Sequence, residues 1–371
     1  MKVLLLGNYP PDRQESMQRF AKMLLSELPA HGVTVELIRP RPFFNAGQQS
    51  RGLGKYLGYL DKFLIFPLQL KKQLRARPDC VVHICDHSNA VYTKYLRRIP
   101  HLVTCHDLLA VRLALGEIPQ NPTGWAGRRL QKMILDGLNR ARAVACVSQA
   151  TKTDVLRLSR LKPEQVKVVY NGLNYSYAPV PPAESTALLE RFHLPGPFLL
   201  HVGDEHWYKN RRGAVEIYAQ LRRLLPAAPA LVLVGKKPSA QLAQFIAEQN
   251  LTAHVIAIAG SSNEELRALY SRAELLLFPS LMEGFGWPIV EAQACGCRVV
   301  TTNRPPMNEI GGEATVYIDP QEIARAAETV RDVITEETVA RREREQQSQA
   351  HAAGFSAEKM VEDYVRLYRK L

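Results

Sequence analysis

The sequence has 371 residues, of which 46% are hydrophobic and 23% charged, and its formal net charge is +12. These values are typical of a soluble globular protein long enough for two hydrophobic cores, and they exclude an intrinsically disordered chain. The longest lipid-like run, FLIFPLQL at 63–70, is much shorter than the roughly twenty residues of a membrane span, so we expect no transmembrane helix.

The charge is distributed unevenly. Up to residue 175 there are 27 Lys and Arg against 12 Asp and Glu, a net charge of +15, while the remainder carries −3. A strongly basic half suits an anionic partner, such as an acidic membrane surface, a phosphorylated acceptor or a nucleic acid. The six cysteines lie mostly in apolar runs. The N-terminal segment has too few apolar residues before Gly7 to be a signal peptide. We therefore expect reduced cysteines and a cytoplasmic protein.

Short apolar runs alternate with amphipathic segments along the first half of the chain. Strands are expected at 2–7, 33–38, 80–85, 102–105, 143–147 and 166–170, with helices at 17–28, 88–98, 123–140 and 149–159. This alternation predicts a parallel sheet that helices cover on both faces. The polar residues that follow these strands include Asn8, Asp86, His87, Ser88, Asn89, His106, Asp107, Ser148 and Asn171.

The segment 53–76 is amphipathic and interleaves aromatic residues with lysines. It suits a covering helix with a basic solvated face, and it also suits a helix that docks on lipid headgroups. The proline-rich segment 174–197 interrupts the pattern and predicts a linker. Strands are then expected again at 198–202, 231–234, 255–259, 275–278 and 299–302. The prediction is an α/β protein with two doubly wound parallel-sheet domains, 1–175 and 176–354, and a last helix at 355–371.

The stretch 278–303, FPSLMEGFGWPIVEAQACGCRVVTTN, carries the strongest chemical signal. A buried strand leads into a loop with Gly284 and Gly286, and a helix then starts near Pro288. Free backbone N–H groups at a helix start suit an anion, and glycines let a ligand approach the backbone. Glu283 and Glu291 could accept hydrogen bonds from hydroxyl groups, although each alone also suits a solvated residue. The whole pattern predicts a site for a ligand with anionic and polyol parts, such as a nucleotide sugar.

Cations are expected near such a site. Lys209, Arg211 and Arg212 follow Gly203, which ends an expected strand. Cations are unfavourable at a helix start, so phosphate binding explains them better than solvation of the first turn does. His106 ends another strand, where it could bind a sugar, stabilise charge near a reacting carbon or be a core histidine.

No zinc spacing, GxSxG elbow, P-loop or GxGxxG motif is present, which argues against a metallohydrolase, a serine hydrolase, an NTPase and a dehydrogenase. Instead, EGFGWPIVEAQACGCRVVTTN resembles the donor-site signature of glycosyltransferase family 4, whose members are retaining enzymes of GT-B architecture. HVGDEHWYKNRR from 201, GSSNEELRALYSRAELLLFPS from 260, ACVSQATKTDVLR from 145 and VTCHD agree with this resemblance. It covers most of the chain.

The resemblance implies a role for each motif residue. Glu291 would hold the nucleotide ribose, and Glu283 with the backbone of Gly284, Phe285 and Gly286 would hold the transferred sugar. Lys209 would neutralise the diphosphate, and His106 would lie near the donor sugar in a cleft between the domains. The leaving diphosphate would take the acceptor's proton without a metal or cofactor, and the last helix would cross back to the first domain.

Two departures from the family pattern stand out. Asp204 replaces the arginine that many relatives have after the glycine, so we expect Arg211 or Arg212 to supply the second cation. The first loop also lacks the usual paired glycines, which puts the acceptor site in doubt.

We interpret the chain as a cytoplasmic, metal-independent, retaining glycosyltransferase that uses a nucleotide-diphosphate sugar and a saccharide or lipid-linked acceptor. The setting would be polysaccharide, lipopolysaccharide or glycolipid assembly. No nucleic-acid partner is expected, and the basic half leaves open a peripheral contact with an anionic membrane. The alternatives are a nucleotide-sugar epimerase and a non-catalytic nucleotide-sugar sensor or scaffold.

Overall fold

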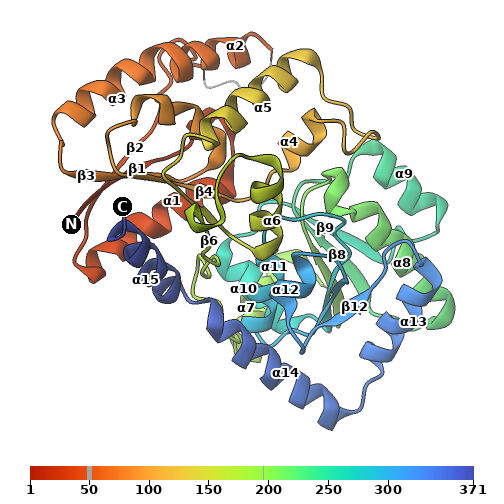
Figure 1. The fold of residues 1–371 in the computed structure, drawn as a ribbon. Coiled ribbons are helices and arrows are strands. Elements are labelled where there is room, and N and C mark those ends of the chain that lie inside the picture. The colour runs from red at the N-terminus through yellow and green to blue at the C-terminus, as the bar shows by residue number, and fades with distance from the viewer. Residues whose placement is uncertain (48–51, 195) are drawn as a thin grey trace. The chain divides into compact units, whose positions relative to one another are not determined.

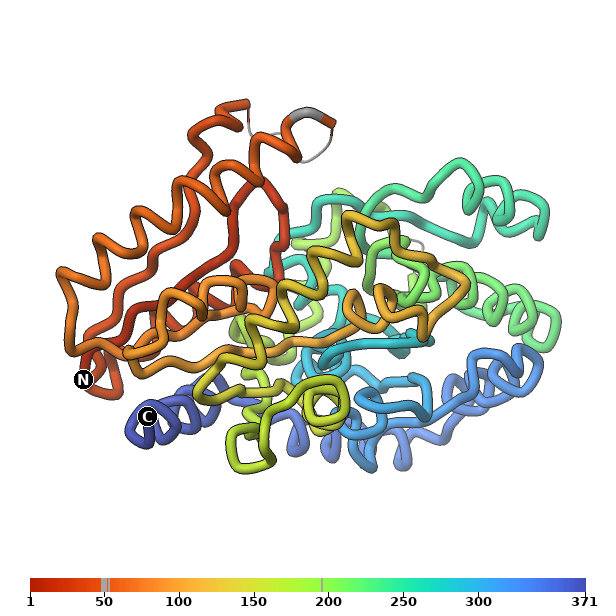
Figure 2. The backbone as a smooth tube through the Cα atoms, turned by 45° about the horizontal axis from the view of Figure 1, so that its top comes forward, coloured from red at the N-terminus to blue at the C-terminus, as the bar shows by residue number. Residues whose placement is uncertain are grey.

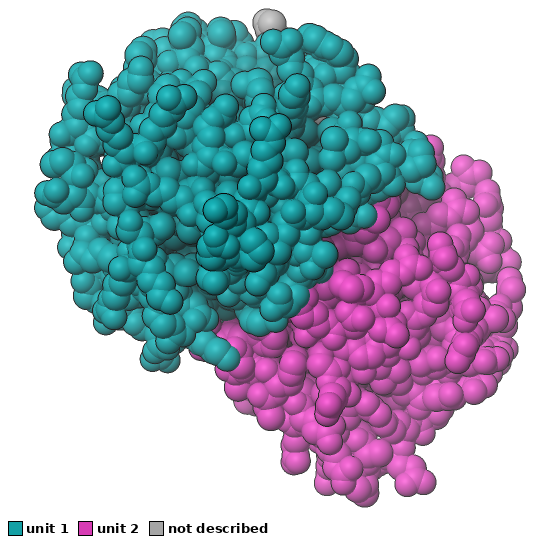
Figure 3. All heavy atoms as spheres, in the orientation of Figure 1, with its two compact units in different colours: residues 1–174, 357–371 teal, residues 175–356 magenta. Residues whose placement is uncertain are grey.

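A computed structural model describes residues 1–47, 52–194 and 196–371. The chain divides into two compact units, which Figure 3 colours separately. Unit 1 comprises Met1–Asn174 and Ala357–Leu371, and unit 2 comprises Tyr175–Ser356. Each unit contains a six-stranded, wholly parallel sheet. The predicted fold class is therefore confirmed.

The sheet of unit 1 has the strand order β2-β1-β3-β4-β5-β6. Its strands are β1 Lys2–Leu6, β2 Thr34–Ile38, β3 Cys80–Ile84, β4 His101–Cys105, β5 Ala143–Cys146 and β6 Val166–Val168. Every residue of β3 and β4 is buried, as expected for strands at the centre of a doubly covered parallel sheet. In the register, Leu6 at the end of β1 lies opposite both Ile38 and Ile84.

Helices cover both faces of this sheet (Figure 1). They are α1 Glu15–Glu27, α2 Leu53–Leu60, α3 Phe66–Arg75, α4 Leu109–Ala114, α5 Trp125–Leu138, α6 Gln149–Leu158 and α15 Ala357–Tyr368. α15 is the last helix of the chain, and buried hydrogen bonds hold it to the sheet. Tyr368 Oη lies 2.7 Å from His83 Nδ1, and Tyr364 Oη lies 2.9 Å from Thr104 Oγ1.

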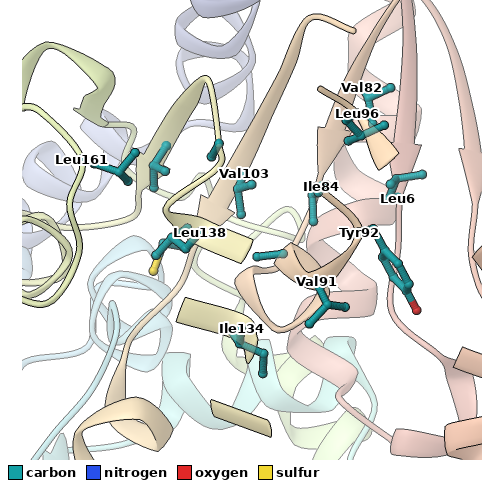
Figure 4. Close-up of a cluster of buried hydrophobic side chains, with 14 of the residues drawn as sticks. Leu6, Val82, Ile84, Val91, Tyr92, Leu96, Val103, Ile134, Leu138 and Leu161 are labelled. Atoms are coloured by element: carbon teal, nitrogen blue, oxygen red, sulfur yellow. The ribbon is translucent and has the colours of Figure 1, made fainter. Parts of the chain in front are cut away.

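The core of unit 1 joins strands to helices that are distant in the sequence. Figure 4 shows side chains from β1, β3 and β4 meeting side chains from the 3-10 helix His87–Tyr95 and from α5. The labelled side chains are Leu6, Val82, Ile84, Val91, Tyr92, Leu96, Val103, Ile134, Leu138 and Leu161. A helix was expected at 88–98, and the structure has a 3-10 helix at His87–Tyr95 instead. The carboxylate of Asp86 caps its start by accepting from the N–H of Ser88.

α2 and α3 run on from each other as one rod, joined by the π-helical turn Asp61–Ile65 (Figure 2). Asp61 is buried in this turn. It accepts hydrogen bonds from Tyr9 Oη at 2.6 Å and from the N–H of Phe44 at 2.8 Å. These bonds satisfy the one carboxylate of the rod, so its exposed charges are all basic.

The sheet of unit 2 has the order β12-β11-β10-β7-β8-β9. Its strands are β7 Phe198–Val202, β8 Ala230–Val234, β9 Val255–Ile258, β10 Leu275–Phe278, β11 Val299–Thr302 and β12 Val316–Ile318. Its helices are α7 Pro182–Leu189, α8 Arg211–Leu224, α9 Ala240–Glu248, α10 Asn263–Arg272, α11 Trp287–Ala294, α12 Met307–Gly311, α13 Ile323–Ile334 and α14 Thr338–Ala352. β12 was not predicted, because a strand of three residues at a sheet edge, two half-buried and one buried, gives too weak a pattern.

All six cysteines are buried and unpaired within the described residues. In the described part of the chain, none of the helices is both long and apolar enough to cross a bilayer.

Candidate functional site

The carboxyl ends of β7 and β8 meet at two glycines. A Cβ at Gly235 would lie 2.7 Å from the carbonyl oxygen of Gly203, a distance that real Cβ atoms do not reach. The side chain of Lys209 lies over the other glycine, since a Cβ at Gly203 would be 3.5 Å from Lys209 Cδ. Glycine at 235 therefore lets the two strand ends come together, and the lysine packs beside Gly203 at an ordinary van der Waals distance.

Lys209 forms an ion pair with Glu283. Its Nζ atom lies 2.8 Å from Oε1 and 2.9 Å from Oε2 of the carboxylate, and 5.4 Å from the centroid of the Phe278 ring. The side chains of Lys209 and Glu283 are 20% and 8% exposed. The structure thus brings together two of the predicted site residues, which are far apart in the sequence.

The glycine loop ends at the start of α11. Gly286 has φ 100°, a left-handed conformation that favours glycine, and Pro288 lies in the first turn of the helix. Phe285 is buried, and its ring packs edge-on against Trp287 at 6.2 Å and Phe355 at 5.8 Å. The aromatic side chain fixes the loop from within unit 2, and the backbone around Gly284 is what such a loop offers to a ligand.

Glu291 lies one turn further along α11 and is 5% exposed. Its Oε2 atom accepts a hydrogen bond of 2.9 Å from Tyr270 Oη. Burial, followed by the charge of Glu291, raises the pKa of Tyr270 well above its usual value, so the phenol remains a donor. Tyr270 packs in turn against the ring of Tyr177 at 6.0 Å. The carboxylate is therefore held in one orientation.

The two arginines that were expected to supply a second cation point elsewhere. Arg211 is buried, and its guanidinium donates to the carbonyl oxygens of Lys236 at 2.6 Å and Leu233 at 3.3 Å. Arg212 is exposed, pairs with Glu216 at 2.9 Å and lies over the ring of Phe245. In this arrangement Arg211 supports the end of β8, and Arg212 belongs to the outer face of α8.

A second lysine lies at the joined strand ends. Lys236 Nζ lies 2.8 Å from Asp204 Oδ2, and its backbone N–H donates to Asp204 Oδ1. Asp204 directly follows Gly203, at the position where an arginine was expected from the family pattern. The site thus holds two lysines, each paired with a carboxylate, so its local charge is close to balanced.

His106 lies in unit 1, at the end of β4. Its Nε2 atom is 2.9 Å from the carbonyl oxygen of Cys85, so Nε2 carries the proton and Nδ1 is the acceptor of the ring. Burial lowers the pKa of His106, against the opposing effect of Asp86. The ring is therefore neutral near pH 7, which suits a hydrogen bond from a sugar hydroxyl better than stabilisation of a developing charge.

Sequence reasoning assigned no separate role to three residues that shape the site. Tyr270 could not be recognised from the sequence, because nothing in the residues of its helix shows that it faces Glu291. Asn210 caps α8 by accepting from the N–H of Gly213, and its amide donates to the carbonyl oxygen of Pro279 at 3.0 Å. Lys236 was visible only as one of several residues after a strand. Among the described residues, no group of three or more His, Cys, Asp and Glu side chains could hold a metal ion.

Family models match both halves of the chain. Residues 17–177 match the sequence profile described as Glycosyltransferase Family 4, and residues 190–352 match the profile described as Glycosyl transferases group 1. The chain belongs to glycosyltransferase family 4. The group 1 match lies within unit 2, which also contains the glycine loop, Lys209, Glu283 and Glu291.

Several known proteins are similar to this family 4 chain. O-antigen chain mannosyltransferase B of Escherichia coli is 26% identical over 246 residues, which are 64% of this chain and 63% of that protein. The serotype-specific mannosyltransferase WbdA of Escherichia coli is 26% identical over 277 residues, 71% of this chain and 33% of that protein. The matches thus span from a third to about three fifths of these relatives' lengths.

A solved structure supports the fold. The crystal structure of Anabaena Alr3699/HepE in complex with UDP and glucose has a TM-score of 0.76 and 18% identity, and the match covers both chains completely. The two parallel six-stranded sheets with flanking helices match GT-B glycosyltransferase structures.

Proposed function

We propose that this protein is a retaining, metal-independent glycosyltransferase that moves a sugar from a nucleotide-diphosphate sugar to a hydroxyl group. The observation that carries the proposal is an arrangement of polar groups in unit 2. It consists of the Lys209–Glu283 ion pair, the glycine loop at the start of α11 and the Tyr270–Glu291 hydrogen bond. UDP and glucose bound to the similar Anabaena protein support a nucleotide-sugar donor.

Each feature of the donor site has a chemical task in this proposal. Glu291, oriented by Tyr270, accepts hydrogen bonds from the ribose hydroxyls. Lys209 and the start of α11 stabilise the diphosphate, whose negative charge grows as it leaves. Glu283 accepts hydrogen bonds from hydroxyls of the transferred sugar. The two members of the ion pair thus bind neighbouring parts of the donor, Lys209 the diphosphate and Glu283 the sugar.

The reaction replaces one bond at the anomeric carbon with another. The bond from this carbon to the phosphate oxygen breaks, and a bond to the acceptor oxygen forms on the same face. The acceptor's proton passes to the departing diphosphate, so the protein need not supply a base. Neutral His106 of unit 1 offers its Nδ1 atom as an acceptor for a sugar hydroxyl.

The acceptor is proposed to be a saccharide or a lipid-linked saccharide in polysaccharide, lipopolysaccharide or glycolipid assembly. The names of the two Escherichia coli relatives support this setting. We also propose that the protein works in the cytoplasm, where nucleotide sugars are made.

The test is a transfer assay preceded by a donor screen. Thermal shift with UDP-, GDP- and ADP-sugars identifies the donor. The protein is then incubated with that donor, with and without simple glycoside acceptors and with EDTA. We expect nucleoside diphosphate release that needs an acceptor, survives EDTA and gives a product with the donor's anomeric configuration by NMR. An altered sugar in the absence of acceptor would instead indicate an epimerase, and no turnover with any acceptor would indicate a scaffold.

Peripheral membrane contact is proposed on the outer face of α2 and α3. The large side chains Tyr56, Leu60, Phe63, Leu64 and Leu68 are 37% to 67% exposed there. They recur at helical spacing, and the exposed charges around them are Lys55, Lys71, Lys72 and Arg75. Exposed aromatic and aliphatic side chains among lysines suit the headgroup layer of an anionic bilayer.

Liposome sedimentation tests this contact. We expect sedimentation with vesicles that contain phosphatidylglycerol, weaker sedimentation with phosphatidylcholine alone, and a clear loss for Leu64→Glu. Leu115→Glu is the matched control, because Leu115 is an equally exposed leucine of unit 1 outside this helix face. Equal sedimentation with neutral and anionic vesicles, or equal effects of the two substitutions, would reject the contact.

A further inference from the structure

A pocket of about 200 Å³ opens on the surface of unit 1, between the start of α3, the 3-10 helix His87–Tyr95 and α5. Its floor is formed by Pro67, Val91 and Tyr92, which are buried. Figure 4 shows Val91 and Tyr92 within the core of unit 1, so the floor of the pocket is part of the packed interior. The described residues that line the pocket all belong to unit 1 and differ from those proposed to bind the donor.

The size of the pocket limits what it can hold. Pockets that enclose a whole drug-sized ligand measure roughly 300–1,000 Å³, so a pocket of about 200 Å³ takes one group of a larger molecule. The rest of that molecule would lie on the exposed side chains at the opening. Phe63 and Met133 form part of the lining and are 37% and 41% exposed, and Leu64, the neighbour of Phe63, is 55% exposed. The occupant therefore has an apolar part that remains outside the pocket.

Cations without an acidic partner lie around the pocket. Lys94 and Arg140 line it, and the Nζ atoms of Lys94 and Lys71 lie 5.0 Å and 5.4 Å from the centroid of the same Tyr95 ring. Among the described residues, none of these three cations forms an ion pair. The guanidinium of Arg140 donates to the carbonyl oxygen of Asp136 at 2.9 Å, which holds it in place. Like charges gathered in one place repel one another, and a bound anion offsets that repulsion, so the pocket suits a phosphate.

One carboxylate narrows the choice of ligand. Asp136 also lines the pocket, and its carboxylate forms no ion pair with a described residue. This group repels a bare phosphate but accepts hydrogen bonds from hydroxyl groups. Lys94 and Arg140 outnumber it, so the lining keeps a net positive charge. A phosphocholine group brings neither a net charge nor a hydroxyl donor, whereas a phosphoglycerol group brings a negative charge and hydroxyl groups together.

We propose that this pocket binds the phosphoglycerol headgroup of an anionic lipid, whose acyl chains lie along Phe63, Leu64 and Leu68 of the rod. The lipid as the source of the phosphate rests on the membrane contact proposed above, whereas the preference for a hydroxyl-bearing phosphate rests on the pocket itself. A basic surface that attracts an anionic bilayer through charge alone does not distinguish headgroups of equal charge. A lined pocket does, and it also fixes the orientation of unit 1 on the bilayer.

Binding is measured on the whole protein with single lipids rather than bilayers. Dihexanoyl phosphatidylglycerol is titrated below its critical micelle concentration. The comparison lipids are dihexanoyl phosphatidylmethanol, which has the same charge but no hydroxyl group, and dihexanoyl phosphatidylcholine. The reporter is the NMR signal of the Met133 methyl group in protein labelled at its methionine methyl groups, assigned with Met133→Leu. We expect a saturable shift with phosphatidylglycerol, weaker binding of phosphatidylmethanol and no saturable shift with phosphatidylcholine.

Substitutions at the pocket locate the headgroup. Lys94→Gln and Arg140→Gln should each weaken phosphatidylglycerol binding about fivefold, the effect of losing one partly exposed contact to a phosphate. Lys72→Gln is the matched control, because Lys72 is an exposed lysine of α3 that does not line the pocket, and the affinity should change less than about twofold. Asp136→Ala should reduce the preference for phosphatidylglycerol over phosphatidylmethanol, because it removes both the acceptor for hydroxyl groups and the repulsion of the phosphate. All four side chains are exposed, so the melting temperatures should stay nearly unchanged.

Four results would overturn the headgroup site. The first is an unchanged Met133 signal with phosphatidylglycerol, and the second is equal binding of phosphatidylglycerol and phosphatidylcholine. The third is an equal loss of affinity for Lys94→Gln and Lys72→Gln, which would mean attraction by the basic surface as a whole. The fourth is binding of free glycerol 1-phosphate as tight as that of the lipid, which would mean that the pocket takes a soluble phosphate.

The headgroup site and the membrane contact fail separately. If vesicles with phosphatidylglycerol sediment the protein but the Met133 signal does not respond to the single lipid, the membrane contact stands and the headgroup site fails. If the single lipid binds in the pocket but vesicles do not sediment the protein, the membrane contact fails and the headgroup site stands. Neither result depends on the transfer of a sugar, so the proposed enzymatic function is tested independently.

Discussion

Because Lys209 and Glu283 form an ion pair, we predict that Glu283→Gln raises the affinity for a nucleoside diphosphate and lowers the affinity for a nucleotide sugar. Glu283→Gln keeps the shape of the side chain but removes its charge, which releases Lys209 from a partner at 2.8 Å and 2.9 Å. A nucleoside diphosphate without a sugar should then bind more tightly, because the lysine no longer divides its charge between carboxylate and phosphate. A nucleotide sugar should bind less tightly, because its hydroxyls lose a charged acceptor.

The magnitudes follow from the exposure of the pair. With side chains 20% and 8% exposed, the pair lies between a surface and a buried ion pair, so its release is worth about 1 kcal/mol, or about fivefold in diphosphate affinity. Hydrogen bonds to a charged group contribute about 1.5–3 kcal/mol. Subtracting the gain leaves a net loss of about 0.5–2 kcal/mol, or roughly 2- to 30-fold, for the nucleotide sugar.

Calorimetry with the nucleoside diphosphate and with the corresponding nucleotide sugar measures both affinities. Glu216→Gln is the matched control, since Glu216 forms an ion pair with Arg212 on the outer face of α8 and should leave both affinities unchanged. Changes of the same sign for the two ligands, or no change in either, would refute the assignment of Lys209 to the diphosphate and Glu283 to the sugar.

Three further substitutions test neighbouring features. Asp204→Asn should tighten diphosphate binding about two- to fivefold by calorimetry, because it frees the exposed Lys236 from a surface ion pair; a weakened affinity would contradict this. Tyr270→Phe should weaken nucleotide binding about tenfold, because the carboxylate of Glu291 loses the hydrogen bond that orients it. An unchanged affinity would mean that the phenol does not contribute to nucleotide binding. Tyr368→Phe should lower the free energy of unfolding by about 1 kcal/mol in urea titrations, because it leaves His83 Nδ1 without its partner, and no change would mean that this bond does not anchor α15.

The fold was largely predictable from the sequence, because central parallel strands are apolar on both faces and the helices between them are amphipathic. β12 was not predicted because it has only three residues and lies at the sheet edge. The helix expected at 88–98 is a 3-10 helix at His87–Tyr95, and hydrophobic periodicity over so short a segment does not distinguish the two helix types.

The candidate site was predictable where its residues are neighbours in the chain and unpredictable where they are not. The glycine loop and its two glutamates form one motif, but Lys209 and Glu283 are 74 positions apart, and only the meeting of β7 and β10 brings them together. Two successive residues of a helix point about 100° apart, so a sequence cannot show which of Arg211 and Arg212 turns inward. The structure turns Arg211 into the protein, toward carbonyl oxygens, and leaves Arg212 outside.

Nucleotide-sugar binding by Glu291→Ala tests the central claim most directly. Glu291 is buried and its carboxylate is oriented by Tyr270. Removing it costs the hydrogen bond from Tyr270 but also removes a buried charge, so the melting temperature should stay nearly unchanged. We predict that calorimetry with the donor found in the screen shows binding to the wild type and none to Glu291→Ala. Unaltered binding by the variant would contradict the placement of the donor in unit 2.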